Sequence, residues 1–496
     1  MSSTAYDLYQ GADPRLADGN PSRLGQIDRS LRTPVLFFFA LSILWLLAGS
    51  VFGVVSAIKM HAPQFLGATE WLTFGITRTL HLNMVMFGWG SNAIYGLSLW
   101  LMHRLCRTDL EHSWVPTLGG VIWNLAIVAG FVGIASGHMT GVEWLEMPKE
   151  VAPALAVAFL MIGLWNVVAF ARRKTEHVYV SQWYILAAIF WFPLIYCVAE
   201  LMILWYPAKG TVQAVTNWWF GHNALGLWLT PMGVAAMYYF IPKVLGKPIH
   251  SYYLSIVGFW TFAFFYNWAG VHHLIGGPIP VWMQSAGIVA SVMMVIPVLV
   301  TAINFHQTTA GISNWVTIHR SPTLRFIVFG ALNYTLSSVG GSLMALREVN
   351  TVTHFTNATV GHAHHGMYAF LSMVLFGSMY FIVPRLLYRE WPSRLLINLH
   401  FWLCALGVIG YVVVMSIHGV MQGIDTNNGV AFAGLAGIAA KAASWNGMRT
   451  LFGTLMALGH VAFAVNFFWM LVQKKQDAAA GPTLFSGKAS HNGAAR

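Results

Sequence analysis

The chain contains twelve apolar segments, each long enough to cross a lipid bilayer as an α-helix. A helix rises about 1.5 Å per residue, so about 20 apolar residues span the hydrocarbon core. Only 9% of the 496 residues are charged, whereas soluble domains carry about 25% charged residues. We therefore predict an all-α fold, a polytopic membrane bundle of about twelve transmembrane helices. The predicted spans are residues 33–57, 78–103, 115–136, 151–172, 181–206, 217–242, 252–275, 280–304, 325–347, 362–385, 396–418 and 448–473.

The basic residues are distributed unevenly between the two sides of these spans. Of the 27 Lys and Arg residues, 20 fall on the side that also holds both termini, and 7 fall on the other side. The positive-inside rule then places both termini in the cytoplasm. The net charge of +11 therefore reflects membrane topology, and membrane lipid rather than nucleic acid is the expected partner.

The spans divide the chain into one membrane domain and two tails. Residues 1–32 are polar and are predicted to form a cytoplasmic N-terminal tail. The membrane domain covers 33–473, and residues 474–496 are predicted to be a disordered cytoplasmic tail. The longest external loop, 419–447, is rich in Gly and Ala, and we expect it to pack on the outer surface or dip inward. The three cysteines form no C-x-x-C-H motif, which excludes covalent haem c in this chain.

Six histidines lie inside or at the ends of four predicted spans. Polar residues within membrane helices cost free energy and usually mark function. The alternating directions of the spans place all six at the outer end of the bundle, at one membrane depth. Chance placement would scatter them, so a shared metal site is favoured over isolated core histidines. These residues are His81, His222, His272, His273, His362 and His364.

The spacing within one helix indicates two separate metals. His362 and His364 are two residues apart, so at about 100° per residue they point to nearly opposite faces. One helix can thus hold two irons, with His81 as a second axial ligand to one of them. A bis-histidine haem suits electron transfer, and a haem with an open position suits ligand chemistry.

The other histidines suit a third metal. His272 and His273 are adjacent and can lean toward one ion, and His222 completes a three-imidazole site suited to copper, zinc or iron. Tyr266 lies six residues before His272, too deep in the membrane for an interfacial anchor. Its phenol is a candidate donor of a proton and an electron to bound oxygen.

Tyr252 and Ser255 lie closer to the cytoplasm on the same predicted helix as Tyr266, on nearly the same face. The three are candidates for a hydrogen-bonded proton path. Ser and Tyr also pack helices together without any such role, and the pattern alone leaves both interpretations open.

Four stretches resemble the catalytic subunit of cbb3-type cytochrome c oxidases, the C-family of haem–copper oxidases. The resemblance covers about residues 35–475. The stretches are R-T-L-H-L-N-M-V-M-F-G-W (78–89), N-W-W-F-G-H-N-A-L-G (217–226), F-Y-N-W-A-G-V-H-H-L (265–274) and V-N-T-V-T-H-F-T-N-A-T-V-G-H-A-H-H-G (349–366).

The resemblance implies a terminal oxidase that reduces dioxygen to water, with coupled proton uptake and pumping. It also implies a bacterial inner membrane and membrane-anchored haem c subunits docked on the outer face. Two b-type haems and one copper ion are the implied cofactors. The implied ligands are His81 and His364 for the low-spin haem, His362 for the high-spin haem, and His222, His272 and His273 for copper, with Tyr266 cross-linked to His222.

Three further positions follow from the resemblance. Glu143, in G-V-E-W, is similar to a calcium-associated segment of the family, although a solvated carboxylate explains it equally well. His354 is a candidate contact for haem propionates or a solvated loop residue. The family's ninth-helix glutamate corresponds to Gly340, with no acid before Glu348, and this departure bears on proton delivery rather than on the metal ligands.

Two other functions compete with the oxidase. Nitric oxide reductases share the haem histidines but bind non-haem iron, with a glutamate four residues after the sixth-helix histidine. Here that position is Gly226, and Tyr266, which those relatives lack, is present. An all-imidazole site favours copper, and a carboxylate favours iron. A secondary transporter would place its histidines near the bilayer midplane at related repeats, and we find no such repeat.

Overall fold

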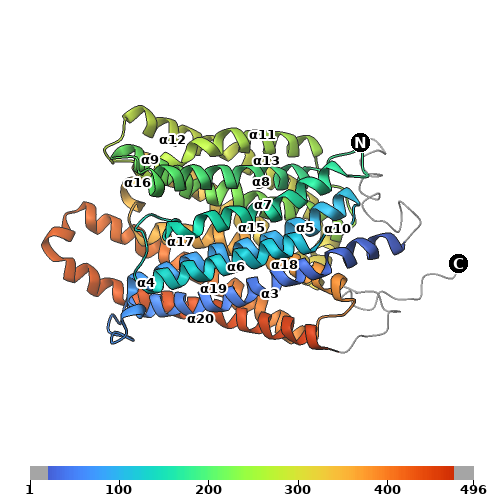
Figure 1. The fold of residues 1–496 in the computed structure, drawn as a ribbon. Helices are drawn as coiled ribbons and strands as arrows, with labels where there is room; N and C mark the ends of the chain where they lie inside the picture. Colours follow the sequence, from blue (N-terminus) through green and yellow to red (C-terminus); the bar gives the residue numbers. More distant parts are fainter. Residues whose placement is uncertain (1–20, 474–496) are drawn as a thin grey trace.

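The computed structural model describes residues 21–473 and consists of α-helices that run side by side in one elongated bundle (Figure 1). Within that range no residue forms a β-strand. Backbone amides inside a bilayer have no water to bond, so apolar segments adopt helices, which satisfy these groups internally. The predicted all-α membrane bundle is confirmed.

Long helices account for the predicted spans, and several spans combine two consecutive elements. The helices are α3 (Pro21–Lys59), α4 and α5 (Phe74–Asn83, Ser91–Cys106), α6 (Trp114–Ala135), α7 (Ala152–Ala171), α8 (Val180–Ala199), α9 and α10 (Thr211–Asn223, Thr230–Leu245), α11 (Tyr252–Ala269), α12 and α13 (Val281–Met293, Val295–Thr309), α14 (Ile312–Arg320), α15 (Pro322–Met344), α16 (Arg347–Thr353), α17 and α18 (Asn357–His364, Met373–Leu387), α19 (Arg394–Asn427) and α20 (Val430–Val472). Among the described residues, 11 helices are long and apolar enough to span a membrane. The remaining predicted span corresponds to α4 and α5, which a π-helical segment joins into one continuous helix.

The structure differs from the predicted boundaries at two places. Helix α3 begins at Pro21, so the end of the predicted N-terminal tail is helical, and the rest of both predicted tails lies outside the described residues. The predicted external loop 419–447 is a helical hairpin in which α19 and α20 continue and project beyond the bundle (Figure 1). The expectation that it packs on the surface or dips inward is wrong. Its many alanines, the strongest helix formers, favour continuation of both helices.

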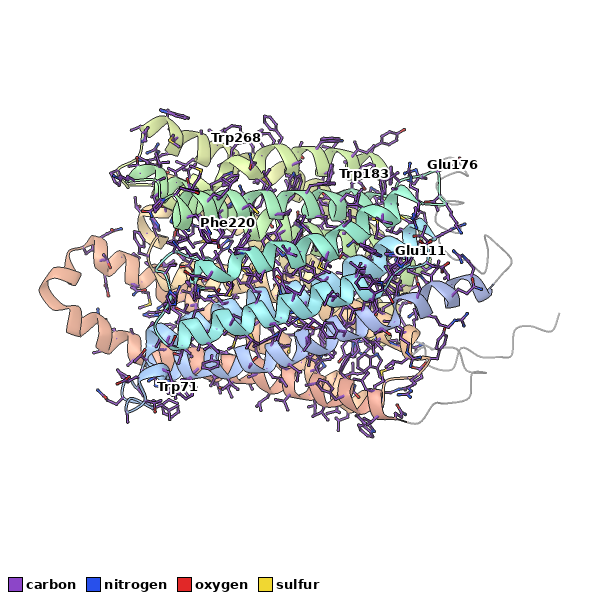
Figure 2. All side chains as sticks on the ribbon, in the orientation of Figure 1. Trp71, Glu111, Glu176, Trp183, Phe220 and Trp268 are labelled. Carbon is purple, nitrogen blue, oxygen red and sulfur yellow. The ribbon has the colours of Figure 1, made fainter. Side chains whose placement is uncertain are left out.

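Helices α9–α10 and α17–α18 form the centre of the bundle together with α5, most of whose residues are buried. In α9–α10 and α17–α18, 89% of the most apolar stretch is buried, compared with 33–50% in the other nine of the eleven helices. The outer helices expose large apolar side chains to the surroundings; Trp268 on α11, for example, projects from the surface (Figure 2). Because these faces would contact lipid tails, polar side chains are expected on the inward-facing sides of the helices.

The ends of the chain's helical part lie together. The first turn of α3 and the last turn of α20 are at the same end of the bundle (Figure 1), as an even number of crossings requires. Glu111 and Glu176 lie at that end, whereas Trp71 and Phe220 lie toward the other (Figure 2). The helix ends that carry the predicted ligands are at the latter end.

Candidate metal centre

Three of the helices that carry predicted ligands change to π-helical hydrogen bonding shortly after the histidine. The change follows His81, His222 and His364 within three residues. Such wide turns are rare in proteins and occur frequently at functional sites. The π-helical segments are η2 (Met84–Gly90), η5 (Ala224–Leu229) and η7 (His365–Ser372). The amino-acid pattern gave no sign of them.

The rings of His81, on α4, and His364, on α17, lie face to face. Their ring centroids are 6.4 Å apart and the rings are within 13° of parallel. The Nδ1 atom of His81 donates to the carbonyl of Gly49 at 2.8 Å, and that of His364 donates to the carbonyl of Val360 at 2.9 Å. Both Nε2 atoms remain for a metal. Metal–imidazole bonds of about 2 Å on each side of one ion suit this separation, so the pair fits bis-imidazole ligation.

The ring of His81 packs against α3 at Gly53, where the absence of a side chain leaves space for it. A Cβ added at Gly53 would meet its Nδ1 atom at 2.7 Å, closer than real Cβ contacts allow. Gly49 and Gly53 therefore form a groove, one turn long, that accepts the imidazole and its hydrogen bond. The sequence contained this signal as G-x-x-x-G, a pattern that permits close approach between membrane helices.

His222, His272 and His273 form a compact three-nitrogen cluster. One ligand atom from each lies within 4.8 Å of the others. His272 Nδ1 donates to Ser291 Oγ at 2.7 Å, because that hydroxyl donates its own proton to the Gly287 carbonyl. The tautomer so fixed leaves Nε2 of His272 for a metal.

Two features of this cluster fit a bound ion. The Nδ1 atom of His222 is buried without a hydrogen-bond partner within the described residues. An orphaned buried nitrogen costs free energy unless something binds it. The ring of Trp218 stacks on His273 with centroids 4.1 Å apart and limits the movement of that imidazole.

Tyr266 packs directly on a member of the cluster. Its ring centroid is 4.5 Å from that of His222, with 29° between the planes. A Cβ at Gly226 would overlap Cε1 and Cζ of Tyr266. The tyrosine ring thus occupies the volume that any side chain at position 226 would need.

His362 opens onto the same cavity as the cluster. The cavity, of about 290 Å³, is lined by His222, His272, His273, Tyr266 and His362 together with apolar residues such as Phe370. His364 instead packs beside His81, so the two histidines of α17 face different groups of residues. Gly341 contacts the ring of His362, since a Cβ there would lie 2.9 Å from Cε1.

The proposed proton-path residues are only partly linked. Tyr252 donates its hydroxyl proton to the Val178 carbonyl at 3.1 Å. Ser255 is fully buried and accepts from Asn304 Nδ2 at 3.1 Å, and the same amide reaches Tyr238 Oη at 3.4 Å. Sequence reasoning missed Asn304 and Tyr238 because they lie on other helices.

Two glutamates lie on the loop that follows α6, and one of them reaches the cavity. Glu143 lines it and pairs with Arg78 at 3.4 Å. Glu146 is buried and accepts from Asn83 Nδ2 at 3.1 Å. Burial, followed by the nearby charge of Glu143, raises the pKa of Glu146 to about 7, although the Asn83 hydrogen bond opposes the shift. His354 also lines the cavity, and burial lowers its pKa. Sequence reasoning named Glu143 and His354 but not Glu146.

Gly340 faces open space. A Cβ there would meet no atom within 4 Å, so packing does not require a glycine at this position. The adjacent helix turn places Ser337 and Ser338 on the cavity wall. Hydroxyls rather than a carboxylate therefore face the centre from α15.

The membrane bundle and the two clusters of imidazoles define the class of haem–copper oxidase catalytic subunits. A solved structure of a haem–copper terminal oxidase dimer has the same fold, with a TM-score of 0.72 over 92% of this chain and 86% of that one, at 16% identity. The family described as cytochrome c and quinol oxidase polypeptide I matches residues 33–455, and the chain belongs to it.

Individual relatives agree with this placement. The cbb3-type cytochrome c oxidase subunit CcoN1 of Stutzerimonas stutzeri is 33% identical over 397 residues, 78% of this chain and 83% of the relative. Cytochrome c oxidase subunit 1 of Rhodobacter capsulatus is 31% identical over 94% of this chain and 89% of that one. The predicted resemblance to the cbb3-type branch and the predicted terminal oxidase function are confirmed. Haem and copper are the family's cofactors, and the chain is an integral membrane protein.

Proposed function

We propose that this subunit reduces dioxygen between a high-spin haem, held by His362, and a copper ion, held by His222, His272 and His273. The observation that carries the proposal is that all four imidazoles open onto one cavity, with Tyr266 stacked on His222. When bound, the haem iron and copper supply the electrons and the binding site for dioxygen. A second haem, held by His81 and His364, would pass electrons to this cavity.

The protein side chains have distinct tasks in this reaction. Ser291 fixes the tautomer of His272, so that its Nε2 stays directed at the copper position. Tyr266, which lines the cavity beside His222, is positioned to give a proton and an electron to oxygen. Apolar groups such as Phe370 line the same cavity, and they exclude bulk water from the reacting centre.

The lack of space for a side chain at position 226 favours copper over iron. Because the Tyr266 ring fills that volume, a carboxylate four residues after His222 and the tyrosine in its present position exclude each other. The all-imidazole donor set that remains suits copper. Nitric oxide reduction at non-haem iron is the competing function, and this packing argues against it.

Protons would enter from the cytoplasmic end. Ser255, Asn304 and Tyr238 form a buried hydrogen-bonded group between three helices on that side. Tyr334, which lines the active cavity, would be the next phenol on the path. Tyr252, whose hydroxyl is directed to Val178, would stand at the entrance rather than within the chain of groups.

The excess of Lys and Arg on one side favours cytoplasmic termini, with the metal sites near the outer face of a bacterial inner membrane. Haem c subunits would dock there, close to His81. Both haems would be b-type. Glu143, at the cavity mouth, would bind calcium, with Arg78 as a competing positive charge.

Metal analysis of the purified complex tests the proposal, with turnover on dioxygen and nitric oxide recorded from the same sample. We expect one copper per two haems in this subunit and fast consumption of dioxygen. Non-haem iron without copper, with nitric oxide as the faster substrate, would overturn it.

A further inference from the structure

Three side chains, His460 buried and Tyr368 and Ser50 partly buried, form a hydrogen-bonded chain beside the His81–His364 pair, and we call it the Tyr368 relay. Tyr368 Oη lies 2.5 Å from His460 Nε2, and His460 Nδ1 lies 2.7 Å from Ser50 Oγ. The Ser50 hydroxyl donates to the Leu46 carbonyl at 2.6 Å. Because the Ser50 hydroxyl proton is already used in that bond, Ser50 Oγ accepts a hydrogen bond from His460 Nδ1–H. His460 Nε2 then accepts from the Tyr368 hydroxyl, so every bond has a defined direction.

The relay connects the two elements that carry the pair of ligands. Tyr368 is four residues after His364 on the continuous helix α17–η7–α18. Ser50 is the residue next to Gly49, whose carbonyl accepts from His81 Nδ1. His460, on α20, bridges the two and is 4% exposed. The chain of bonds therefore ties the helix bearing one ligand to the backbone group that orients the other.

The groove in α3 makes the orientation of the His81 ring depend on the position of the α3 backbone at Gly49. The His81 ring is held between Gly49, which accepts its proton, and Gly53, which leaves room for it. A small displacement or rotation of α3 at Ser50 would move the Gly49 carbonyl and lengthen that bond. Hydrogen bonds to the second nitrogen of a ligating imidazole set its orientation and its basicity.

A second tyrosine–histidine pair on the same helix supplies a comparison. Tyr380 Oη lies 2.9 Å from His400 Nδ1, also buried between α18 and α19. The series of hydrogen bonds ends at His400, because its Nε2 atom has no hydrogen-bond partner within the described residues. This pair has the same chemistry as the Tyr368 relay but no bonded link to α3.

We propose that Tyr368, His460 and Ser50 are positioning residues that hold the Gly49 carbonyl against His81 and thereby set the reduction potential of the low-spin haem. The inference rests on the proposed role of His81 and His364 as that haem's ligands. Breaking the relay weakens the bond from His81 Nδ1, so the imidazole becomes a poorer donor and the ferric state loses stability. The potential rises.

The test compares Tyr368→Phe and Ser50→Ala with the matched control Tyr380→Phe in the purified complex. The readouts are the midpoint potential of the low-spin haem and its ferric EPR spectrum, which responds to the angle between the two imidazole planes. We expect each relay variant to increase the reduced-to-oxidised ratio about tenfold at fixed ambient potential, a rise of about 59 mV for one electron. Tyr380→Phe should leave both readouts unchanged.

The double variant Ser50→Ala/Tyr368→Phe examines whether the relay acts as a unit. Groups in one hydrogen-bond network show non-additive effects, so its potential should match that of the single variants. Equal potentials in wild type, Tyr368→Phe and Ser50→Ala would overturn the inference, as would an equal shift in Tyr380→Phe.

A separate variant distinguishes this failure from failure of the ligand assignment. His364→Ala should abolish the low-spin spectrum if the proposed function is correct. If it does so while the relay variants behave as wild type, the relay alone is refuted. If His364→Ala retains a bis-histidine spectrum, the ligand assignment itself fails.

Discussion

Replacing Gly226 with alanine should disable oxygen chemistry without removing the haems. The new Cβ would overlap Cε1 and Cζ of Tyr266, and ordinary contact with a Cβ requires 3.4–4 Å. The ring must therefore retreat from His222 by well over the ~1 Å misplacement that costs about 100-fold in rate. Overpacking of this kind also costs about 1–3 kcal/mol of stability, which leaves a folded protein for assay.

The assay is dioxygen consumption by the purified Gly226→Ala complex, with copper content, haem spectra and the cross-linked peptide measured on the same sample. We expect turnover about 100-fold lower, full haem content, and loss of any covalent His222–Tyr266 peptide. Gly340→Ala is the matched control, because a Cβ there meets no atom within 4 Å, and it should behave as wild type.

One result would refute this reasoning. If Gly226→Ala consumes dioxygen at close to the wild-type rate and retains the linked peptide, then the Tyr266 ring does not depend on the absent side chain. The packing argument that favours copper chemistry over iron would then lose its basis.

Four further predictions follow from the geometry of the site. His362→Ala should abolish turnover yet keep the low-spin spectrum, whereas His364→Ala should remove that spectrum; absorbance spectra decide, and the reverse pattern would exchange the two assignments. Ser291→Ala should weaken copper binding about 10–100-fold by freeing the tautomer of a ligand, measured as copper retained against a chelator, with unchanged retention as the contrary result. Asn304→Ala should slow turnover and proton uptake without altering haem or copper content, and wild-type rates would remove this residue from the path. Glu146→Gln should flatten part of the dependence of stability on pH. The carboxyl's folded pKa of about 7 lies above the unfolded 4.5, so wild type loses about 3 kcal/mol relative to the variant as pH rises from about 4.5 to 7. Parallel unfolding curves for the two proteins across that range would contradict it.

The sequence alone determined the spans, their directions and the metal-ligand candidates. Apolar segments of about 20 residues have one stable form in a bilayer, so helix number and alternation follow from composition. Alternation then fixes which end of each span a residue occupies. The grouping of the six histidines at one depth therefore required no tertiary coordinates, and neither did the separation of His362 from His364, which follows from helical periodicity.

The hairpin between α19 and α20 could not be predicted from apolar composition. Length and apolar composition identify a span but not the residue at which a helix leaves the membrane. The segment 419–447 continues as helix because its backbone bonds are local, whatever its surroundings. The π-helical turns after His81, His222 and His364 were likewise invisible, because they depend on packing between helices rather than on residue type.

Only the tertiary structure decided which side chains from distant segments meet. Ser291 beside His272, the Tyr266 ring in the space at Gly226, and Asn304 beside Ser255 are contacts between different helices. Each depends on the rotation of one helix about its axis relative to its neighbour. That rotation is set by the interlocking of many side chains at once, which no single segment encodes. The sequence predicted the six histidines at one depth, and packing divided them between the His81–His364 pair and the cavity.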